Sequence, residues 1–117
     1  MTTLGKNVKI TAPDSARSQT RTMFAAIGAT LVTPNDHMDV FALTGGSNIG
    51  FAYVPAAEAL TAEQMRRAPW LELEVADVET TRARLDALGL QRIEYADQAH
   101  PYFAGPGGFV FRLASSS

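Results

Sequence analysis

Residues 70–89 read WLELEVADVETTRARLDALG, and this stretch decides the fold. It opens with strict alternation of apolar and polar residues, which predicts a β-strand with one buried face. The apolar face carries Leu71, Leu73 and Val75, and the polar face carries Trp70, Glu72 and Glu74. We therefore expect the polar members of this strand to be available for function.

A helix is predicted directly after that strand. Asp77 stands at the N-cap position, where its carboxylate accepts hydrogen bonds from the first turn. The apolar stripe consists of Val78, Leu85 and Leu88, and Gly89 is placed to end the helix. The stretch is thus a strand–helix unit.

The same unit occurs near the start of the chain. Residues 7–28 read NVKITAPDSARSQTRTMFAAIG, with the same alternation, the same Asp and the same closing Gly. By subtraction of residue numbers, the spacings are 63 for Asp14 and Asp77, 61 for Gly28 and Gly89, and 62 for Gly46 and Gly108. Such constancy predicts an internal duplication.

Each half continues with short apolar runs separated by turn residues. In the first half these predicted strands are residues 29–33, 38–43 and 49–54, after a helix that Asp14 would cap. In the second half they are residues 90–95, 102–103 and 109–113. Phe24, Phe51, Phe109 and Phe111 fall at core positions. Neither four-stranded half buries its apolar face alone, so we expect the two to pair.

Residues 55–69 interrupt the pattern. Thr61 and Gln64 have the spacing of a capping box, which predicts a short helix to about residue 67. We predict a first module at 1–56, a linker with this helix at 57–68 and a second module at 69–117, all within one structural domain. A lid over a binding site is the alternative interpretation of the linker.

Composition excludes several classes of protein. The chain has 117 residues, of which 46% are hydrophobic and 19% charged, as is usual for a folded domain. A net charge of −2 without a basic stripe argues against nucleic-acid binding. There is no cysteine, and no run has the length of a membrane span or signal peptide. We expect a soluble cytoplasmic protein with no nucleic-acid or membrane partner.

A duplicated strand–helix–three-strand plan of this size resembles the vicinal oxygen chelate superfamily, which includes glyoxalase I, bleomycin-resistance proteins and extradiol dioxygenases. The resemblance rests on residues 7–14, 23–28, 70–77, 87–89 and 102–108. It implies an α+β fold of two βαβββ modules. Their curved mixed sheets would pair around a cup, with the polar faces lining the cup and the helices outside.

The resemblance also implies where a metal would lie. Metallated members hold a divalent ion with a His or Gln opening the first strand of a module and a Glu on its last strand. The corresponding positions here are Asn7, Gly50, Trp70 and Arg112. Indole does not ligate, Gly has no side chain, and a guanidinium repels a cation. Because catalytic zinc needs about three protein ligands, we predict no metal and no other cofactor.

The polar face of the cup is the predicted ligand site. Its candidate ligand-binding residues are Asn7, Lys9, Trp70, Glu72, Glu74, Tyr102 and Arg112. Trp70 would stack on a planar or cationic ligand. Glu72 or Glu74 would accept hydrogen bonds from amines, and Arg112 would clamp a carboxylate or phosphate. In the alternative interpretation, Arg112 and Glu72 neutralise each other and Trp70 fills space between modules or subunits.

Catalytic residues are not assigned. His37 and His100 fall in a turn and a loop, where exposure or a local hydrogen bond is expected, although His100 shares a strand face with Tyr102 at the rim. Glu72 or Glu74 would serve as a general base only if burial raised its pKa. No nucleophile–base pair and no phosphate-cradling loop can be assembled from the sequence. Whether the protein is an enzyme is therefore left open.

Three functions remain. Resemblance to the bleomycin-resistance branch implies sequestration of a drug or metabolite, cationic ligands included, by a homodimer that shares its cleft between subunits. The alternatives are a lyase, isomerase or dioxygenase-type enzyme of the same superfamily, and a non-catalytic interaction domain. Metal analysis tests the enzyme, and a ligand-induced thermal shift tests the interaction domain.

Overall fold

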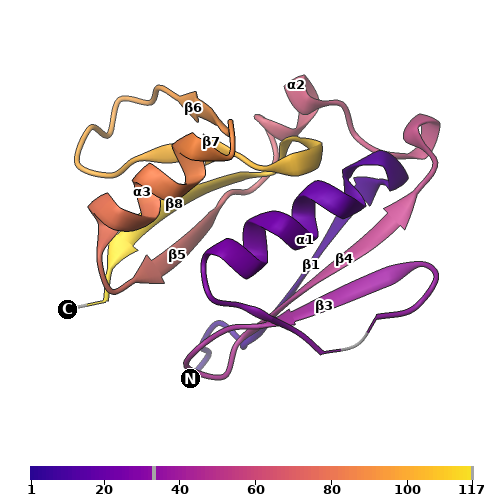
Figure 1. Cartoon of the computed structure of the whole chain (residues 1–117), viewed down its shortest axis with the longest axis horizontal. Coiled ribbons are helices and arrows are strands. Elements are labelled where there is room, and N and C mark those ends of the chain that lie inside the picture. The colour runs from indigo at the N-terminus through magenta and orange to yellow at the C-terminus, as the bar shows by residue number, and fades with distance from the viewer. Residues whose placement is uncertain (33, 117) are drawn as a thin grey trace. The chain divides into compact units, whose positions relative to one another are not determined.

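The computed structural model describes residues 1–32 and 34–116 (Figure 1). The chain forms two compact units, Met1–Ala59 and Leu60–Ser117. The described residues of each unit contain one four-stranded mixed sheet and one long helix, so the predicted α+β class and the βαβββ plan are confirmed. The pairing of the modules around a cup, and the boundaries at 56 and 68, stay predictions.

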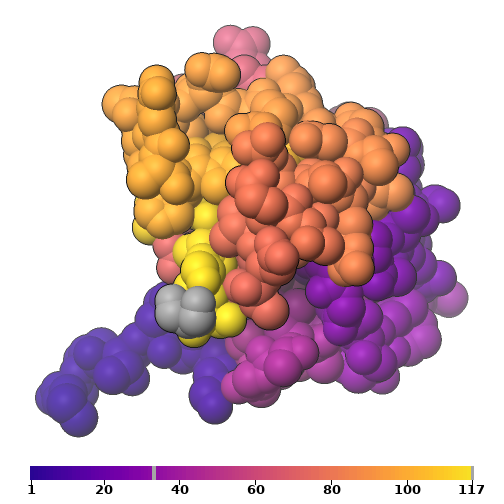
Figure 2. All heavy atoms as spheres, turned by 60° about the vertical axis from the view of Figure 1, so that its left-hand side comes forward, coloured from indigo at the N-terminus to yellow at the C-terminus, as the bar shows by residue number. Residues whose placement is uncertain are grey.

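The first unit follows the predicted element order. It contains β1 (Asn7–Pro13), the 3₁₀ turn η1 (Asp14–Ala16), α1 (Arg17–Ala26), β2 (Thr30–Leu31), β3 (Met38–Ala42), β4 (Asn48–Val54) and the 3₁₀ turn η2 (Ala56–Glu58). The sheet order is β1-β4-β3-β2, with β1 parallel to β4 and the other pairs antiparallel. The strand predicted at 29–33 is shorter than expected, and its last residue, Thr33, lies outside the described residues. Ahead of β1, residues 1–5 form no helix or strand, and Figure 2 shows the N-terminal end of the chain (indigo) projecting outward.

Aromatic packing holds α1 against this sheet. The ring centroid of Phe24 lies 4.6 Å from that of Phe41 and 5.5 Å from that of Phe51. All three side chains are buried, which confirms the core positions predicted for Phe24 and Phe51. Thr20 and Met23 of α1 are buried as well.

The predicted capping role of Asp14 is wrong. Asp14 opens the turn η1, its side chain makes no capping hydrogen bond, and α1 begins three residues later at Arg17. We attribute the later start of α1 to Pro13. Its extended backbone leads into a 3₁₀ turn ahead of the α-helix.

The second unit repeats the plan. It contains α2 (Ala62–Met65), β5 (Leu71–Val75), α3 (Val78–Ala87), β6 (Gln91–Ile93), β7 (Tyr102–Ala104), the 3₁₀ turn η3 (Pro106–Gly108) and β8 (Val110–Ser115). The sheet order is β5-β8-β7-β6, with β5 parallel to β8. The core positions of Phe109 and Phe111 are confirmed. Ser117, the last residue of the predicted second module, lies outside the described residues.

The ends of α3 agree with the sequence, and its stripe agrees in part. The Asp77 carboxylate accepts a hydrogen bond from the Thr80 N–H at 3.1 Å, which confirms the N-cap. Gly89 follows the helix with a φ of +82°, a conformation that favours glycine. Leu85 is buried, but Leu88 is 41% exposed, so its assignment to the apolar stripe is wrong. Leu88 is the C-cap residue, just beyond the last helical residue Ala87.

The strand registers show that the duplication is structural. In the first sheet, Gly50 of β4 lies between Lys9 of β1 and Val40 of β3. In the second sheet, Arg112 of β8 lies between Glu72 of β5 and Tyr102 of β7. Each set of three paired residues forms a row across the first, last and third strands of its module. The two rows occupy equivalent positions in the two sheets, as the alignment of the halves predicted from the sequence requires.

The capping box at the start of α2 is present. Thr61 accepts a hydrogen bond from the Gln64 N–H at 3.1 Å, and the Gln64 side chain accepts one from the Thr61 N–H at 2.9 Å. None of the helices in the described part of the chain has the length and apolarity needed to cross a membrane.

Replacing Thr61 with alanine should lower the free energy of unfolding by about 1 kcal/mol, since the hydroxyl that satisfies the first turn is lost. Urea unfolding followed by circular dichroism measures this change. Thr22→Ala is the control, because the Thr22 hydroxyl bonds to the Ser18 carbonyl within α1 and caps nothing. An equal loss in both variants would contradict a capping effect.

Candidate functional site

The polar face of the second sheet carries the candidate site. Leu73, Phe103 and Phe111 are buried on the face that α3 covers. Since successive side chains of a strand point to opposite faces, the neighbouring residues Glu72 and Arg112 lie on the other face. The register places them side by side in one row that continues to Tyr102.

Arg112 is the centre of this face. Its Nε and Nη2 donate to Glu72 Oε2 at 2.7 and 2.6 Å. Its Nη1 donates to Asp97 Oδ2 and to Tyr102 Oη, both at 3.1 Å. The hydrogen bond with Tyr102, followed by that with Glu72, raises the pKa of Arg112 above its ordinary value. The guanidinium is therefore a fixed cation held between two carboxylates.

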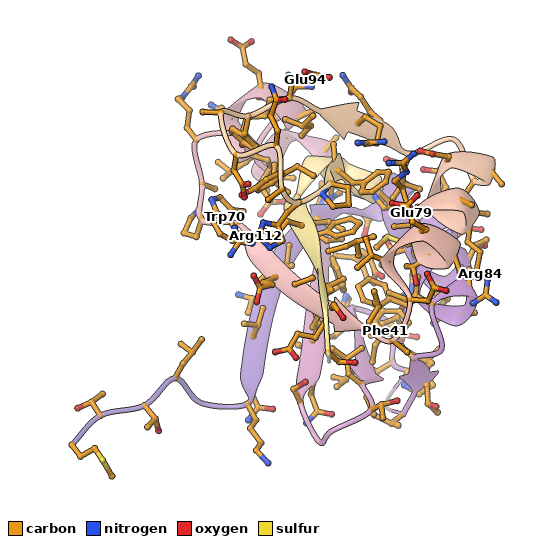
Figure 3. All side chains as sticks on the ribbon, turned by 90° about the vertical axis from the view of Figure 1, so that its left-hand side faces the viewer. Phe41, Trp70, Glu79, Arg84, Glu94 and Arg112 are labelled. Carbon is orange, nitrogen blue, oxygen red and sulfur yellow. The ribbon has the colours of Figure 1, made fainter. Side chains whose placement is uncertain are left out.

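Trp70 provides an aromatic surface beside this cation. The Arg112 Cζ lies 4.6 Å from the centroid of the Trp70 ring, within the range of a cation–π contact. Figure 3 shows the two side chains next to each other. The Trp70 ring also meets Tyr102 edge to face at 5.7 Å, and Tyr102 meets Tyr95 at 4.7 Å. With 43% of its surface exposed, Trp70 remains accessible to a ligand.

Asp97 links a histidine to the same cluster. Its Oδ2 accepts from Tyr102 Oη at 3.0 Å and lies 2.9 Å from His100 Nδ1, while its Oδ1 accepts from the Ala99 N–H at 2.9 Å. The His100 contact, then the Ala99 N–H, lower the pKa of Asp97 to about 2. An ionised carboxylate only accepts hydrogen bonds, so Nδ1 carries the proton and Nε2 of a neutral His100 is an acceptor.

Comparison with solved structures identifies the architecture. The fosfomycin resistance protein FosX from Listeria monocytogenes, solved with Mn(II) and sulfate, matches 100% of this chain and 93% of its own at 14% identity and a TM-score of 0.72. A bleomycin-binding protein complexed with bleomycin matches 98% of this chain and 100% of its own at 15% identity and a TM-score of 0.66. The chain has the fold of the vicinal oxygen chelate superfamily.

A glyoxalase-family protein from Bacillus anthracis shares the vicinal oxygen chelate fold as well, with a TM-score of 0.69 at 15% identity over 97% of this chain and 95% of its own. No family model and no curated protein matches the sequence. At these identities, the solved structures show the fold alone. Function must be argued from this chain's own side chains.

The residues do not fit the metal that the vicinal oxygen chelate resemblance implies. Arg112, at one ligand position, donates to two carboxylates. Gly50, at another, has no donor atom, and a Cβ there would meet Met38 Cε at 2.6 Å. Within residues 1–32 and 34–116, no three His, Cys, Asp or Glu side chains are grouped to hold a metal ion. We therefore derive no metal-dependent chemistry.

The predicted site residues are brought together only in part. Trp70, Glu72, Tyr102 and Arg112 form one cluster, as their hydrogen bonds and ring contacts show; their role in binding stays a prediction. Glu74 is exposed on the same face, two residues beyond Glu72.

Asn7 and Lys9 lie in the first unit, on the exposed face of β1. Asn7 accepts a hydrogen bond from Asn48 Nδ2 at 3.2 Å. The part that these two residues play in a site with the second-unit cluster stays a prediction.

Sequence reasoning missed Asp97 and Tyr95. Asp97 follows the predicted strand at 90–95, in a local turn where its Oδ1 accepts from the Ala99 N–H. The second carboxylate oxygen, Oδ2, however, accepts hydrogen bonds from Tyr102 of β7 and Arg112 of β8. No local sequence pattern predicts these contacts. The local hydrogen bond expected for His100 is present. The signal available in the sequence was Asp97 itself, an acidic residue three positions before His100.

Proposed function

We propose that this protein binds a small organic molecule, a drug or a metabolite, on the polar face of the second sheet and without a metal ion. The observation that carries the proposal is the exposed Trp70 ring beside a hydrogen-bonded set of charged groups around Arg112. An aromatic surface with a few placed polar groups is what small-molecule recognition needs.

The rigidity of the cluster supports this proposal. Each side-chain nitrogen of Arg112 donates to a neighbour, and Tyr102 is itself fixed by Asp97. A ligand would therefore meet preorganised groups and would lose little affinity to ordering them. The solved bleomycin-binding protein with this fold, complexed with bleomycin, adds support by analogy of architecture.

A homodimer in the cytoplasm remains part of the proposal, as expected from the resemblance. Light scattering of the purified chain measures the oligomeric state. The proposal concerns binding and includes no catalytic step, because no three His, Cys, Asp or Glu side chains among the described residues are grouped to hold a metal ion. The enzyme interpretation, a lyase, isomerase or dioxygenase-type activity, stays open.

The test is a thermal-shift screen of small organic amines, carboxylic acids and neutral heterocycles, run with a metal chelator throughout. A ligand present at a hundred times its dissociation constant should stabilise the protein by about 2.7 kcal/mol. Trp70→Ala should weaken binding of that ligand at least tenfold, because the stacking surface is lost.

Arg84→Gln is the matched control for a surface change, since Arg84 is exposed on α3, away from Trp70 and Arg112 (Figure 3). Binding that survives Trp70→Ala unchanged would place the ligand elsewhere. A screen without any stabilising compound, or binding that requires stoichiometric metal, would overturn the proposal.

A further inference from the structure

Resting on that proposed function, we infer that the group recognised at this site is an organic cation, a protonated amine or an amidine on a flat ring. The inference comes from the inventory of donors and acceptors on the polar face of the second sheet. A ligand binds through what the cluster leaves unused, and the unused groups are mainly acceptors.

Every side-chain nitrogen of the charged donor in the cluster is occupied. Arg112 is the one permanent cation among its described members, and its Nε, Nη1 and Nη2 all donate to Glu72, Asp97 or Tyr102. The Tyr102 hydroxyl donates to Asp97. An anionic ligand would compete with two carboxylates for Arg112, so an ion pair with this guanidinium would return little free energy.

The acceptors are available. Glu72 uses only Oε2 for Arg112, which leaves Oε1 for a ligand. Glu74 is exposed two residues further along β5, and no hydrogen bond or ion pair within the described residues holds its carboxylate. The Nε2 of a neutral His100 is a third acceptor, since Nδ1 faces Asp97.

The charge of the face agrees with this inventory. Glu72, Glu74 and Asp97 contribute three negative charges and Arg112 one positive charge, so the face carries −2 when His100 is neutral. The pKa of Asp97 lies at about 2, so its charge persists across the physiological range. A cationic ligand would relieve this excess, and an anionic ligand would add to it.

Trp70 provides a second, independent observation. A planar cation already packs on this ring, because the Arg112 Cζ lies 4.6 Å from the centroid of the Trp70 ring. An indole ring attracts cations through its electron-rich face, and Trp70 keeps 43% of its surface exposed. Aromatic stacking and neighbouring carboxylates together are the environment that an aromatic amidine or amine matches.

The inference gives Arg112 a role different from the clamp expected from the sequence. It is a positioning residue, which holds Glu72 and Asp97 in place and supports one part of the Trp70 ring. The ligand's positive charge is then taken by the carboxylate oxygens that Arg112 leaves unused.

Fluorescence of Trp70 provides the experiment, because the chain contains one tryptophan. Benzamidine, benzyl alcohol and benzoate are titrated as a cationic, a neutral and an anionic probe of similar size. Benzamidine should give a saturable change that weakens as sodium chloride is added. Benzyl alcohol should bind at least tenfold more weakly, and benzoate should give no saturable change.

Glu74→Gln should weaken benzamidine binding at least threefold, since it removes a charge without disturbing the Arg112 hydrogen bonds. Glu79→Gln on α3 is the matched control, and it should leave the titration unchanged; Figure 3 shows Glu79 away from Trp70. Circular dichroism of both variants verifies that they fold.

The outcomes separate the two proposals. Equal binding of benzamidine and benzoate, or a screen whose hits are all neutral or anionic, would overturn the cation inference and leave small-molecule binding intact. A screen without hits of any class would overturn both. Benzamidine binding that is insensitive to salt and to Glu74→Gln would also contradict recognition through the carboxylates.

Discussion

Replacing Asp39 with asparagine should lower the free energy of unfolding by about 3 kcal/mol. The Asp39 side chain is fully buried, 0% exposed, on the face of the first sheet that α1 covers. It accepts from Arg17 Nη2 at 2.9 Å, from Arg21 Nε and Nη2 at 2.9 and 2.8 Å, and from Tyr53 Oη at 3.1 Å. The neutral asparagine amide would leave the guanidinium groups of Arg17 and Arg21 without a counter-ion. Removing one partner of a buried ion pair is strongly destabilising, because the remaining charges are left uncompensated.

The same carboxylate makes stability depend on acid. The Arg21 hydrogen bond, with further help from Arg17, lowers the pKa of Asp39 from 3.8 to about 2 despite its burial. Because the folded pKa lies below the unfolded one, the contribution is fully present above about pH 4. This contribution to the free energy of unfolding is lost as the pH falls toward 2. From the difference between the two pKa values, it amounts to about 2 kcal/mol. The Asp39→Asn variant should lack this part of the acid-induced loss.

Urea unfolding from pH 2 to 7, followed by circular dichroism, measures both effects. Asp36→Asn is the matched control, because Asp36 is exposed and only its backbone carbonyl bonds to Arg17. It should change the free energy of unfolding by less than about 0.5 kcal/mol. If Asp39→Asn behaved like Asp36→Asn, the buried ion cluster would not stabilise the first unit.

Replacing Gly108 with alanine should destabilise the second unit by more than about 2 kcal/mol. Gly108 has a φ of +93°, and a Cβ there would meet Ala62 Cα at 2.7 Å and Ala62 Cβ at 3.0 Å. The left-handed conformation alone costs about 1 to 2 kcal/mol for a residue with a Cβ. The close approach adds to this, because the obstacle includes the backbone of α2, which cannot rotate away.

Gly89→Ala separates the two contributions. Gly89 has a similar φ of +82°, but a Cβ there would meet nothing within 4 Å. It should therefore show only the conformational cost, about 1 kcal/mol. Thermal and urea unfolding compare the two variants, and amide hydrogen exchange should show α2 loosened only in Gly108→Ala. Equal losses would mean that α2 and η3 do not depend on their close contact.

The fold was predictable because its signals are local. Alternation along residues 70–75 and the paired landmarks of the two halves established the strands, the helices and the duplication. Turn glycines such as Gly89 were readable for the same reason, since a positive φ favours glycine wherever it occurs. The matching strand registers of the two sheets follow from that repeat.

The candidate site was predictable only where it lies on regular strands. Glu72 and Arg112 were expected to be neighbours, and they are. Asp97 was not expected among them, since residues 94–101 must fold back over the sheet to bring it there. Asp39 was overlooked as well, although a carboxylate on the same strand face as Phe41 is a signal of a buried ion pair.

The matching rows of the two sheets have a consequence for stoichiometry. The row of the second unit carries a carboxylate, a guanidinium and a phenol, whereas the row of the first carries Lys9, Gly50 and Val40. The two sheets thus share their backbone arrangement and differ in the side chains that they carry. Equilibrium dialysis should accordingly count a single ligand per polypeptide, with a linear Scatchard plot.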